Sequence, residues 1–198
     1  MLGAVLAVAV VVVGVLWYSA GRGGDDQPAG GGDAPAGGAG GGEPAPTPAD
    51  FVTYQDPEGR FSISVPRDWK LLAEPDPFLV ASPDNSQNSV LVRVQQIGQT
   101  IDPGNVDELK PFTQAALGPE VTVLAEQPVT LPSGLSGYYY LYTFADEEAR
   151  VQGAHAHYFL FEGNRLHTLV FQALPAESFT EMASVFDQIV ETYRAGTG

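Results

Sequence analysis

YQDPEGRFSISVPRDW, residues 54–69, indicates the architecture of its domain more clearly than any other segment of the sequence. Phe61, Ile63 and Val65 alternate with polar residues, so their side chains would share one face of a β-strand. Pro66 has no backbone N–H to donate to a neighbouring strand, and it ends the run. The segment therefore predicts a strand that buries one face.

Similar strand-like runs continue toward the C-terminus. Their ranges are 78–82, 89–97, 121–131, 137–145, 150–161 and 165–173. Residues 56–59 have the composition of a turn, and residues 162–165 predict a two-residue hairpin loop in which Gly163 adopts a positive φ. These runs predict an antiparallel sheet.

The C-terminal segment predicts an amphipathic helix. Its apolar residues recur at spacings of three and four, at Phe179, Met182, Phe186, Ile189, Val190 and Tyr193. Ser178 and Glu181 have the spacing of a capping box at its start, and Gly196 can stop it.

A second helix is predicted near residues 105–117. Asn105 and Glu108 form another capping pair, but Pro111 interrupts the segment, so a helix that begins at this proline is the alternative. An antiparallel sheet that is interrupted by one helix and closed by another predicts an α+β fold.

The first 18 residues, MLGAVLAVAVVVVGVLWY, contain no charged side chain. As a helix they would span roughly 27 Å, close to the ~30 Å hydrocarbon core of a bilayer. We expect residues 1–19 to form a single transmembrane anchor, and a cleaved signal peptide ending near residues 19–21 is the alternative. The lack of a basic flank also suggests that the start codon lies upstream.

The orientation of this anchor rests on two opposing features. Arg22, the one basic residue nearby, favours a cytoplasmic domain by the positive-inside rule. A single N-terminal anchor followed by a flexible stalk is instead typical of a domain presented outward. We expect an extracytoplasmic domain at the cell membrane.

Residues 20–50 have the composition of a linker, with 11 Gly, 7 Ala and 5 Pro among 31 residues. They cannot bury enough apolar surface to offset the entropy lost on ordering. We therefore expect a disordered, Gly/Ala/Pro-rich linker between the anchor and the domain.

Residues 51–198 are long enough for one domain with its own core. They carry 8 basic and 19 acidic side chains, a formal charge of −11. A surface this acidic repels nucleic acid, so we expect no nucleic-acid partner. The chain has no cysteine, which excludes disulfides and a lipid-modified cysteine as the anchor.

Residues 54–69 resemble the opening of PsbP-like domains, a family that includes many bacterial membrane-anchored or lipid-anchored proteins. The run Thr168–Phe171 and the apolar helix after it are similar to that family's closing strand and helix. The resemblance spans nearly all of residues 51–198. It implies an α-β-α sandwich around an antiparallel sheet, and it implies no catalytic residues, because the shared motif contains none.

The three histidines raise the question of a metal site. His155 and His157 alternate on one strand and share a face. The predicted hairpin loop sets His167 opposite Leu160, which places His167 on the other face. Because three ligands do not converge, we expect no metal and no other cofactor; weak metal binding by the two neighbouring histidines is the alternative.

Two polar segments have simple interpretations. Residues 133–137 lack the spacing of a nucleophile elbow, because Tyr138 occupies the position of its final glycine, and they predict a turn. Residues 146–148, Asp-Glu-Glu, lack EF-hand spacing and predict a charged hairpin tip. We expect no catalytic residues.

One set of aromatic residues suits recognition. Tyr138, Tyr140 and Tyr142 share one face of their strand, and a four-residue loop after it would set Tyr140 opposite His155 and Tyr138 opposite His157. Rigid rings with hydrogen-bonding tips favour binding, so Tyr138, Tyr140, His155 and His157 form a possible partner patch. Ordinary packing in the sheet is the alternative, and a register change of one residue would exchange the faces.

Taken together, these features predict a membrane-tethered, non-enzymatic interaction or accessory module at the cell envelope. Its expected partners are the membrane, through residues 1–19, and another envelope protein. The alternative is a carrier that binds a small molecule or a lipid in a cleft between the sheet and the helix.

Overall fold

The computed structural model describes residues 50–101 and 109–196. The anchor predicted at residues 1–19 lies outside the described residues, as does the linker predicted at residues 20–50 except for its last residue. Within the described ranges, no helix has both the length and the apolar character needed to cross a bilayer.

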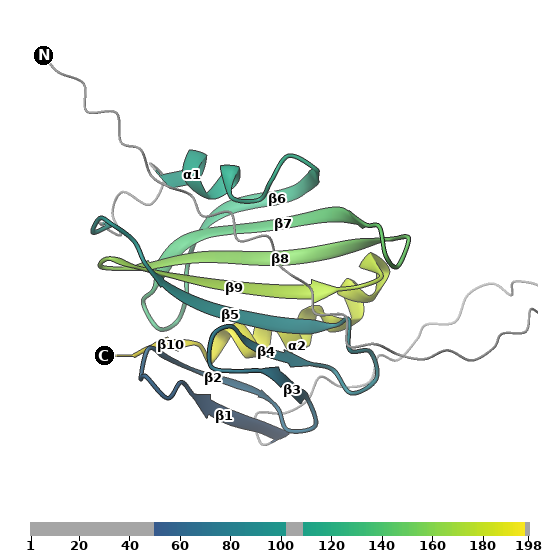
Figure 1. Cartoon of the computed structure of the whole chain (residues 1–198), viewed down its shortest axis with the longest axis horizontal. Coiled ribbons are helices and arrows are strands. Elements are labelled where there is room, and N and C mark those ends of the chain that lie inside the picture. The colour runs from purple at the N-terminus through teal and green to yellow at the C-terminus, as the bar shows by residue number, and fades with distance from the viewer. Residues whose placement is uncertain (1–49, 102–108, 197–198) are drawn as a thin grey trace, which may run out of the picture. The chain divides into compact units, whose positions relative to one another are not determined.

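The described residues form two antiparallel sheets and short helices (Figure 1). The strands are β1 (Phe51–Gln55), β2 (Phe61–Pro66), β3 (Lys70–Ala73), β4 (Phe78–Ala81), β5 (Ser89–Gln96), β6 (Val121–Thr130), β7 (Ser136–Asp146), β8 (Val151–Glu162), β9 (Arg165–Ala173) and β10 (Arg194–Ala195). The helices are α1 (Lys110–Ala115), the 3-10 helix η3 (Ala176–Ser178) and α2 (Phe179–Glu191). A large seven-stranded sheet has the order β3-β4-β5-β9-β8-β7-β6, and a small three-stranded sheet has the order β1-β2-β10.

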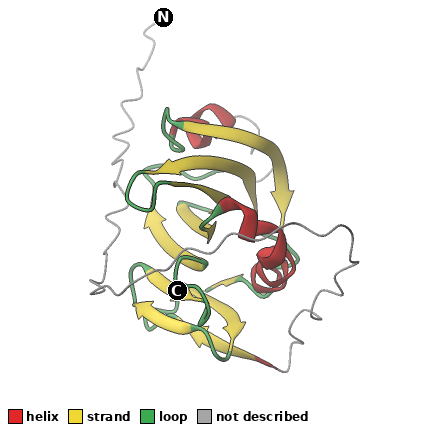
Figure 2. Cartoon of the chain, turned by 90° about the vertical axis from the view of Figure 1, so that its right-hand side faces the viewer, coloured by secondary structure: helices red, strands yellow, loops and turns green. Residues whose placement is uncertain are grey.

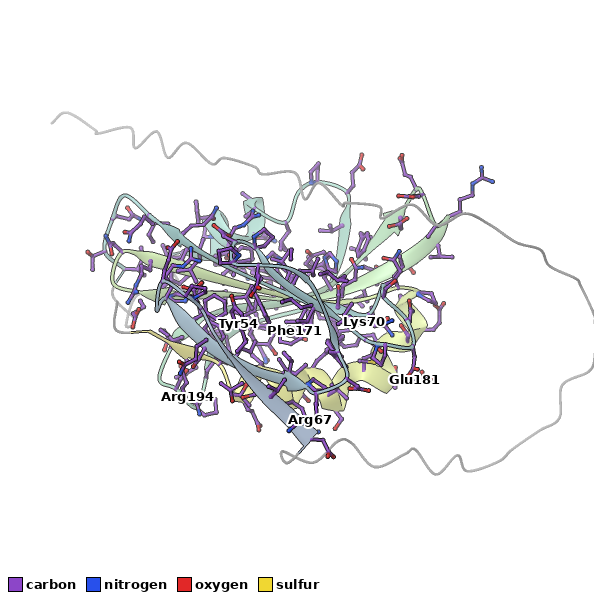
Figure 3. The ribbon with its side chains drawn as sticks, turned by 60° about the horizontal axis from the view of Figure 1, so that its bottom comes forward. Tyr54, Arg67, Lys70, Phe171, Glu181 and Arg194 are labelled. Carbon is purple, nitrogen blue, oxygen red and sulfur yellow. The ribbon has the colours of Figure 1, made fainter. Side chains whose placement is uncertain are left out.

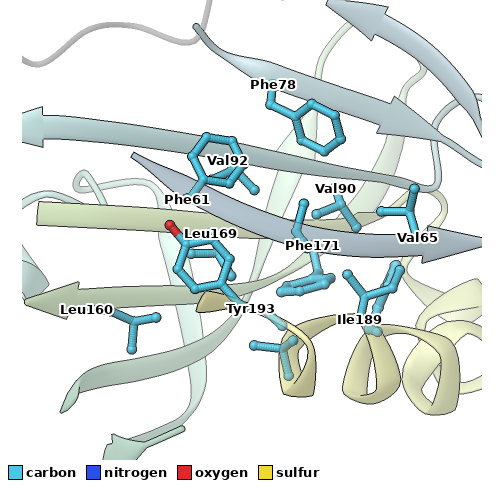
Figure 4. Packing of buried hydrophobic residues seen from close by; sticks show 14 of the residues in the cluster. Phe61, Val65, Phe78, Val90, Val92, Leu160, Leu169, Phe171, Ile189 and Tyr193 are labelled. Carbon is cyan, nitrogen blue, oxygen red and sulfur yellow. The ribbon is translucent and has the colours of Figure 1, made fainter. Parts of the chain in front are cut away.

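The large sheet is covered on both faces (Figure 2). Side chains of β2 and α2 pack on one face against β4, β5, β8 and β9, as Figure 4 shows for the residues that it labels. On the other face, residues of β7, β8 and β9 pack with residues that flank α1. The predicted α+β class is confirmed. Residues of α2 and of β2, a strand of the small sheet, pack together on the first of these faces of the large sheet. The predicted sandwich did not include a second, small sheet.

The predicted strand after residue 60 is confirmed as β2. Phe61, Ile63 and Val65 are buried, with 3%, 0% and 4% of their surface exposed. The other six predicted strands are also present, with ends within two residues of those expected. Strands β1, β3 and β10 were not predicted, because their sequences, FVTYQ, KLLA and RA, show no regular alternation of apolar and polar residues.

Helix α2 confirms the predicted C-terminal helix, but not its capping box. The Ser178 hydroxyl makes no cap bond; it lies 3.0 Å from Oδ1 of Asn88 and 2.7 Å from the carbonyl oxygen of Pro175. Tertiary contacts therefore replace the local cap. The helix ends before Gly196, whose N–H donates to the carbonyl of Arg60 at 2.7 Å.

Helix α1 follows the alternative prediction. It begins at Lys110 with Pro111 in its first turn, where a missing N–H removes no helical hydrogen bond. The predicted capping pair of Asn105 and Glu108 lies outside the described residues.

Candidate functional site

Strands β7 and β8 bring the tyrosines and histidines of the predicted patch together. Tyr140 lies opposite His157, and Tyr142 lies opposite His155. The predicted pairing of Tyr140 with His155 and of Tyr138 with His157 is wrong, because the four-residue loop begins one residue later than expected. A shift of two in the paired residue keeps every side chain on its face. The same residues therefore gather in one group, which we name the Tyr/His cluster: Tyr138, Tyr140, Tyr142, His155 and His157.

The Tyr/His cluster is buried. None of its members exposes more than 9% of its surface. Thr113 of α1 contacts the cluster, and its hydroxyl oxygen lies 2.7 Å from that of Tyr140. The alternative interpretation, packing in the sheet, describes what the structure shows. Partner recognition by Tyr138, Tyr140, His155 and His157 stays a prediction, and it would require the cover over this face to move.

A directional chain of hydrogen bonds runs through this cluster. The Gln172 amide donates to the carbonyl of Gln87 at 3.0 Å, so its Oε1 accepts from Nε2 of His155 at 2.9 Å. Nδ1 of His155 then accepts from the Tyr142 hydroxyl at 2.9 Å. The Tyr142 oxygen accepts in turn from Nδ1 of His157 at 3.3 Å. Nε2 of His157 is left as a buried acceptor with no hydrogen-bond partner among the described residues.

Burial keeps these groups uncharged at neutral pH. Removal from water lowers the pKa of His155 to about 4 and the pKa of His157 to about 3. The same desolvation raises the pKa of Tyr142 far above its ordinary value. The cluster therefore contains a buried polar network of uncharged groups.

His167 lies opposite Leu160, and this part of the prediction is confirmed. Its Nδ1 is 2.7 Å from the hydroxyl of Tyr193 on the face that α2 covers. Desolvation, with the nearby charge of Arg165, lowers the pKa of His167 to about 4, so its 3.7 Å contact with Glu162 is not an ion pair at neutral pH. The described residues contain no group of three or more His, Cys, Asp or Glu side chains that could hold a metal ion.

The space between α2 and the large sheet is filled by side chains. Phe171 of β9 is completely buried, as are Ile189 of α2 and Tyr193 (Figure 4). Two hollows on the domain, one polar and one beside β6, include no residue of α2 in their linings. Neither of these two hollows lies between the sheet and the helix, where the carrier hypothesis requires a cleft.

A polar hollow of about 540 Å³ lies beside the turn before β2 and the hairpin between β8 and β9. It is lined by Glu58, Arg60, Val94, Gln95, Gln96, Glu162, Gly163, Asn164 and Arg165. Its arginines are already paired: Arg165 forms an ion pair with Glu162, and Arg60 pairs with buried Asp56. The lining of this hollow includes no histidine, serine or cysteine.

Asp56 and Arg60 organise this hollow. Oδ1 of Asp56 accepts from Nη2 of Arg60, and Oδ2 accepts from Nε, each at 2.8 Å. These bonds lower the pKa of Asp56 despite its burial. Sequence reasoning identified only a turn here; the spacing of four between an acid and a base across it was the signal for the pair.

Strand β6 forms one edge of the large sheet (Figure 1). It pairs with β7 on one side, and seven consecutive residues, 122–128, are exposed. Leu124 has no counterpart on β7 because a β-bulge separates Val123 from Ala125, and 59% of its surface is exposed. A long exposed edge of this kind can pair with another chain.

A second hollow, of about 390 Å³, lies at the start of this edge strand. It is lined by Leu117, Gly118, Pro119, Glu120, Val121, Phe144, Ala145 and Glu147. Apolar walls and two carboxylates therefore lie beside the edge strand.

The structure agrees with the predicted turn at residues 133–137 and with the predicted charged hairpin tip at residues 146–148. Residues 133–137 include a turn between β6 and β7, in which Gly134 has a φ of +87° and donates to the carbonyl of Leu131. Residues 146–148 lie at the tip of the β7–β8 hairpin, where Oδ1 of Asp146 accepts from the N–H of Ala149.

No protein-family model and no curated protein matches this sequence. A protein from Bacteroides thetaiotaomicron VPI-5482 is similar in structure, with a TM-score of 0.54 and 15% identity over 74% of this chain, which spans about half (48%) of that protein. LpqN of Mycobacterium tuberculosis, involved in cell envelope biogenesis, gives a TM-score of 0.51 and 18% identity over 78% of this chain and 99% of its own. Cyanobacterial PsbP (CyanoP) from Synechocystis sp. PCC 6803 gives a TM-score of 0.49 and 16% identity over 82% of this chain and 99% of its own.

At these identities the likeness concerns the fold alone. It agrees with the order of elements that the sequence predicts, from the half-buried strand after residue 60 to the closing helix. The chain therefore has a PsbP-like fold, built from antiparallel sheets and a C-terminal helix.

Proposed function

We propose that this chain is a non-enzymatic, protein-binding accessory module of the cell envelope. Residues 1–19 would hold it in the membrane, residues 20–50 would give it reach, and the domain would stand outside the cytoplasm. Confinement near the membrane would raise its effective concentration for membrane neighbours to about millimolar. The involvement of LpqN, which has a similar fold, in cell envelope biogenesis supports this address.

The observation that carries the binding role is the exposed edge of β6. A sheet edge presents N–H and C=O groups that another chain can pair with, and natural proteins usually cover or shorten such edges. Here the edge strand has ten residues, and it exposes Val123 and Leu124 in the middle of a strongly acidic domain.

The arrangement of the titratable groups supports a role without catalysis. The histidines are buried and neutral in the sheet faces, and none of them lines either of the two hollows. The charged side chains around the polar hollow pair with one another, and those on the outer surface are scattered, as Figure 3 shows for Arg67, Glu181 and Arg194. Neither of the two hollows is lined by a histidine, serine, cysteine or lysine, so carboxylates are the candidate bases there.

Two matched variants test the binding role. Leu124→Asp changes the edge of β6, and Leu72→Asp changes an exposed leucine on β3 at the other end of the same sheet, where 52% of the residue is exposed. We expect chemical crosslinking of the full chain in native membranes to yield a partner complex that falls at least tenfold with Leu124→Asp and stays within twofold with Leu72→Asp. Equal melting temperatures would show that both variants fold.

A complex that forms equally well with both variants would contradict binding through β6. Protease treatment of intact cells tests the address separately: we expect the domain to be digested, and a protected domain would contradict the outward orientation.

The polar hollow favours a second, lesser function, the binding of a small polar ligand. Its volume of about 540 Å³ falls within the range of small-molecule sites, although its lining is charged rather than apolar. A screen of small anions and zwitterions should then raise the melting temperature of the full chain, and Arg165→Gln should abolish the rise.

A further inference from the structure

We infer that β6 binds an extended, basic segment of a partner protein as an additional strand of the large sheet. This inference rests on the proposed function and specifies how the partner is held. It assigns one lysine or arginine of the segment to the hollow at the start of β6, between Glu120 and Glu147.

The backbone of β6 has a neighbouring strand on one side. β6 is the last strand of the large sheet, and its hydrogen-bonded neighbour is β7. Helix α1 contacts this region through side chains: Lys110 pairs with Glu126, and Thr113 bonds to Tyr140. Residues 122–128 nevertheless stay exposed, so an incoming strand can reach the edge.

Two features of β6 limit self-association through its edge. The bulge at Leu124 interrupts the ladder, and Pro128 has no N–H to donate. Such features weaken indiscriminate edge-to-edge pairing. Backbone bonds alone therefore hold a strand weakly here, and side-chain contacts must select the partner.

The negative charge of the domain favours a basic partner. Residues 51–198 have a formal charge of −11, so a second copy of the domain is repelled, whereas a basic segment is attracted. The nearest hollow has the same preference, because its two charged residues, Glu120 and Glu147, are both acidic.

The lining of the hollow at the start of β6 suits a basic side chain. Leu117, Pro119 and Phe144 supply apolar walls beside the two carboxylates. A lysine or arginine combines an aliphatic stem with a charged end, and this combination fits such a lining. Val123 and Leu124, which are exposed farther along β6, can contact apolar residues of the same segment.

Peptide binding to the full chain in non-ionic detergent tests the charge requirement. The probe is a fluorescein-labelled twelve-residue peptide of alternating lysine and valine, compared by anisotropy with the same peptide carrying glutamate for lysine. We expect the basic peptide to bind at least tenfold more tightly. The double variant Glu120→Gln/Glu147→Gln should weaken its binding at least fivefold, while Glu58→Gln, an exposed acid at the polar hollow, should change it less than twofold.

N-methylated peptides test strand addition without altering the protein. In an added strand one alternate set of amides faces β6 and the other faces solvent. N-methylation of one set should abolish binding, and N-methylation of the other set should leave affinity within threefold. Shifts of the NMR amide signals of residues 122–127 should accompany binding of the active peptides.

Equal loss with both N-methylated sets, equal binding of the acidic peptide, or a dimer of the full chain formed through β6 would each overturn strand addition by a basic segment. The proposed function would still stand if Leu124→Asp, unlike Leu72→Asp, reduced the crosslinked partner complex. Loss of that selectivity in membranes would overturn the proposed function itself.

Discussion

The hydroxyl of Tyr193 lies 2.7 Å from Nδ1 of His167, and both side chains are completely buried. This bond joins the segment after α2 to the first part of β9. It explains how a short C-terminal stretch is fixed against the large sheet.

Tyr193→Phe should lower the free energy of unfolding by about 1–3 kcal/mol, because it leaves Nδ1 of His167 buried without a partner. Tyr139→Phe is the matched control. The hydroxyl of Tyr139 makes no hydrogen bond within the described residues, so its removal should change stability by less than about 0.5 kcal/mol. Urea unfolding of both variants measures the difference, and equal effects would contradict the role of the Tyr193–His167 bond.

The buried histidines predict loss of stability in mild acid. The folded pKa values, about 4 for His155 and about 3 for His157, lie below the ordinary value of 6.5. Between pH 6.5 and these values the unfolded chain binds more protons, so the free energy of unfolding falls as the pH falls. At pH 5 the loss should be about 2 kcal/mol for each histidine.

His157→Phe isolates this effect. The ring of His157 already stacks on that of Phe159, with 4.0 Å between centroids, so phenylalanine fits the same place. In the variant, the loss of stability between pH 7 and pH 5 should be about 2 kcal/mol smaller. Asp56 does not obscure this difference, because it adds acid sensitivity only below about pH 4. An unchanged pH dependence in urea unfolding would contradict the neutral, buried state of His157.

Asp56→Asn should lower the free energy of unfolding by about 2–4 kcal/mol, because it removes the buried partner of Arg60. Glu58→Gln removes an exposed carboxylate near the same arginine and should change stability by less than about 1 kcal/mol. Thermal or urea unfolding distinguishes the two. Similar losses would show that the Asp56–Arg60 pair has no special structural role.

Gly137→Ala should be among the most damaging single changes. A Cβ at Gly137 would lie 1.8 Å from the carbonyl oxygen of Phe159 on β8, so β7 or β8 would have to move. We expect a loss of about 3 kcal/mol or more, or failure to fold. Gly98 has open space around its Cβ position, and Gly98→Ala should be tolerated in the same expression and unfolding assay.

Alternation and amphipathic spacing predicted the elements that depend on local pattern. The burial of Phe61 and Ile63 in β2 follows from a period of two, and the burial of Phe186 and Ile189 in α2 follows from a period near 3.6. The same patterns place His167 on the face opposite to His155 once the two-residue loop is identified.

What the sequence did not predict depends on contacts between distant residues. Ser178 bonds with Asn88, 90 positions away, rather than with its own helix. The β7–β8 loop starts one residue later than expected, which changes the partner of Tyr140. Burial of the Tyr/His cluster depends on what covers the sheet, and alternation shows which residues share a face without showing what lies above it.

The polar hollow shows the same limit. Asp56 and Arg60 are close in the sequence, but Arg165 is connected to Arg60 only in the folded domain, through Gly196, whose carbonyl accepts from Arg165 and whose N–H donates to the carbonyl of Arg60. No local pattern signals that three segments will meet in this way.

Amide hydrogen exchange of the full chain, free and crosslinked to its partner in native membranes, tests the binding role of β6 most directly. We expect the amides of residues 122–127 that face away from β7 to exchange rapidly in the free chain, because they lie on an exposed edge, and to gain at least tenfold protection in the complex. Unchanged exchange along β6, with new protection elsewhere in the domain, would contradict the assignment of this edge as the partner-binding surface.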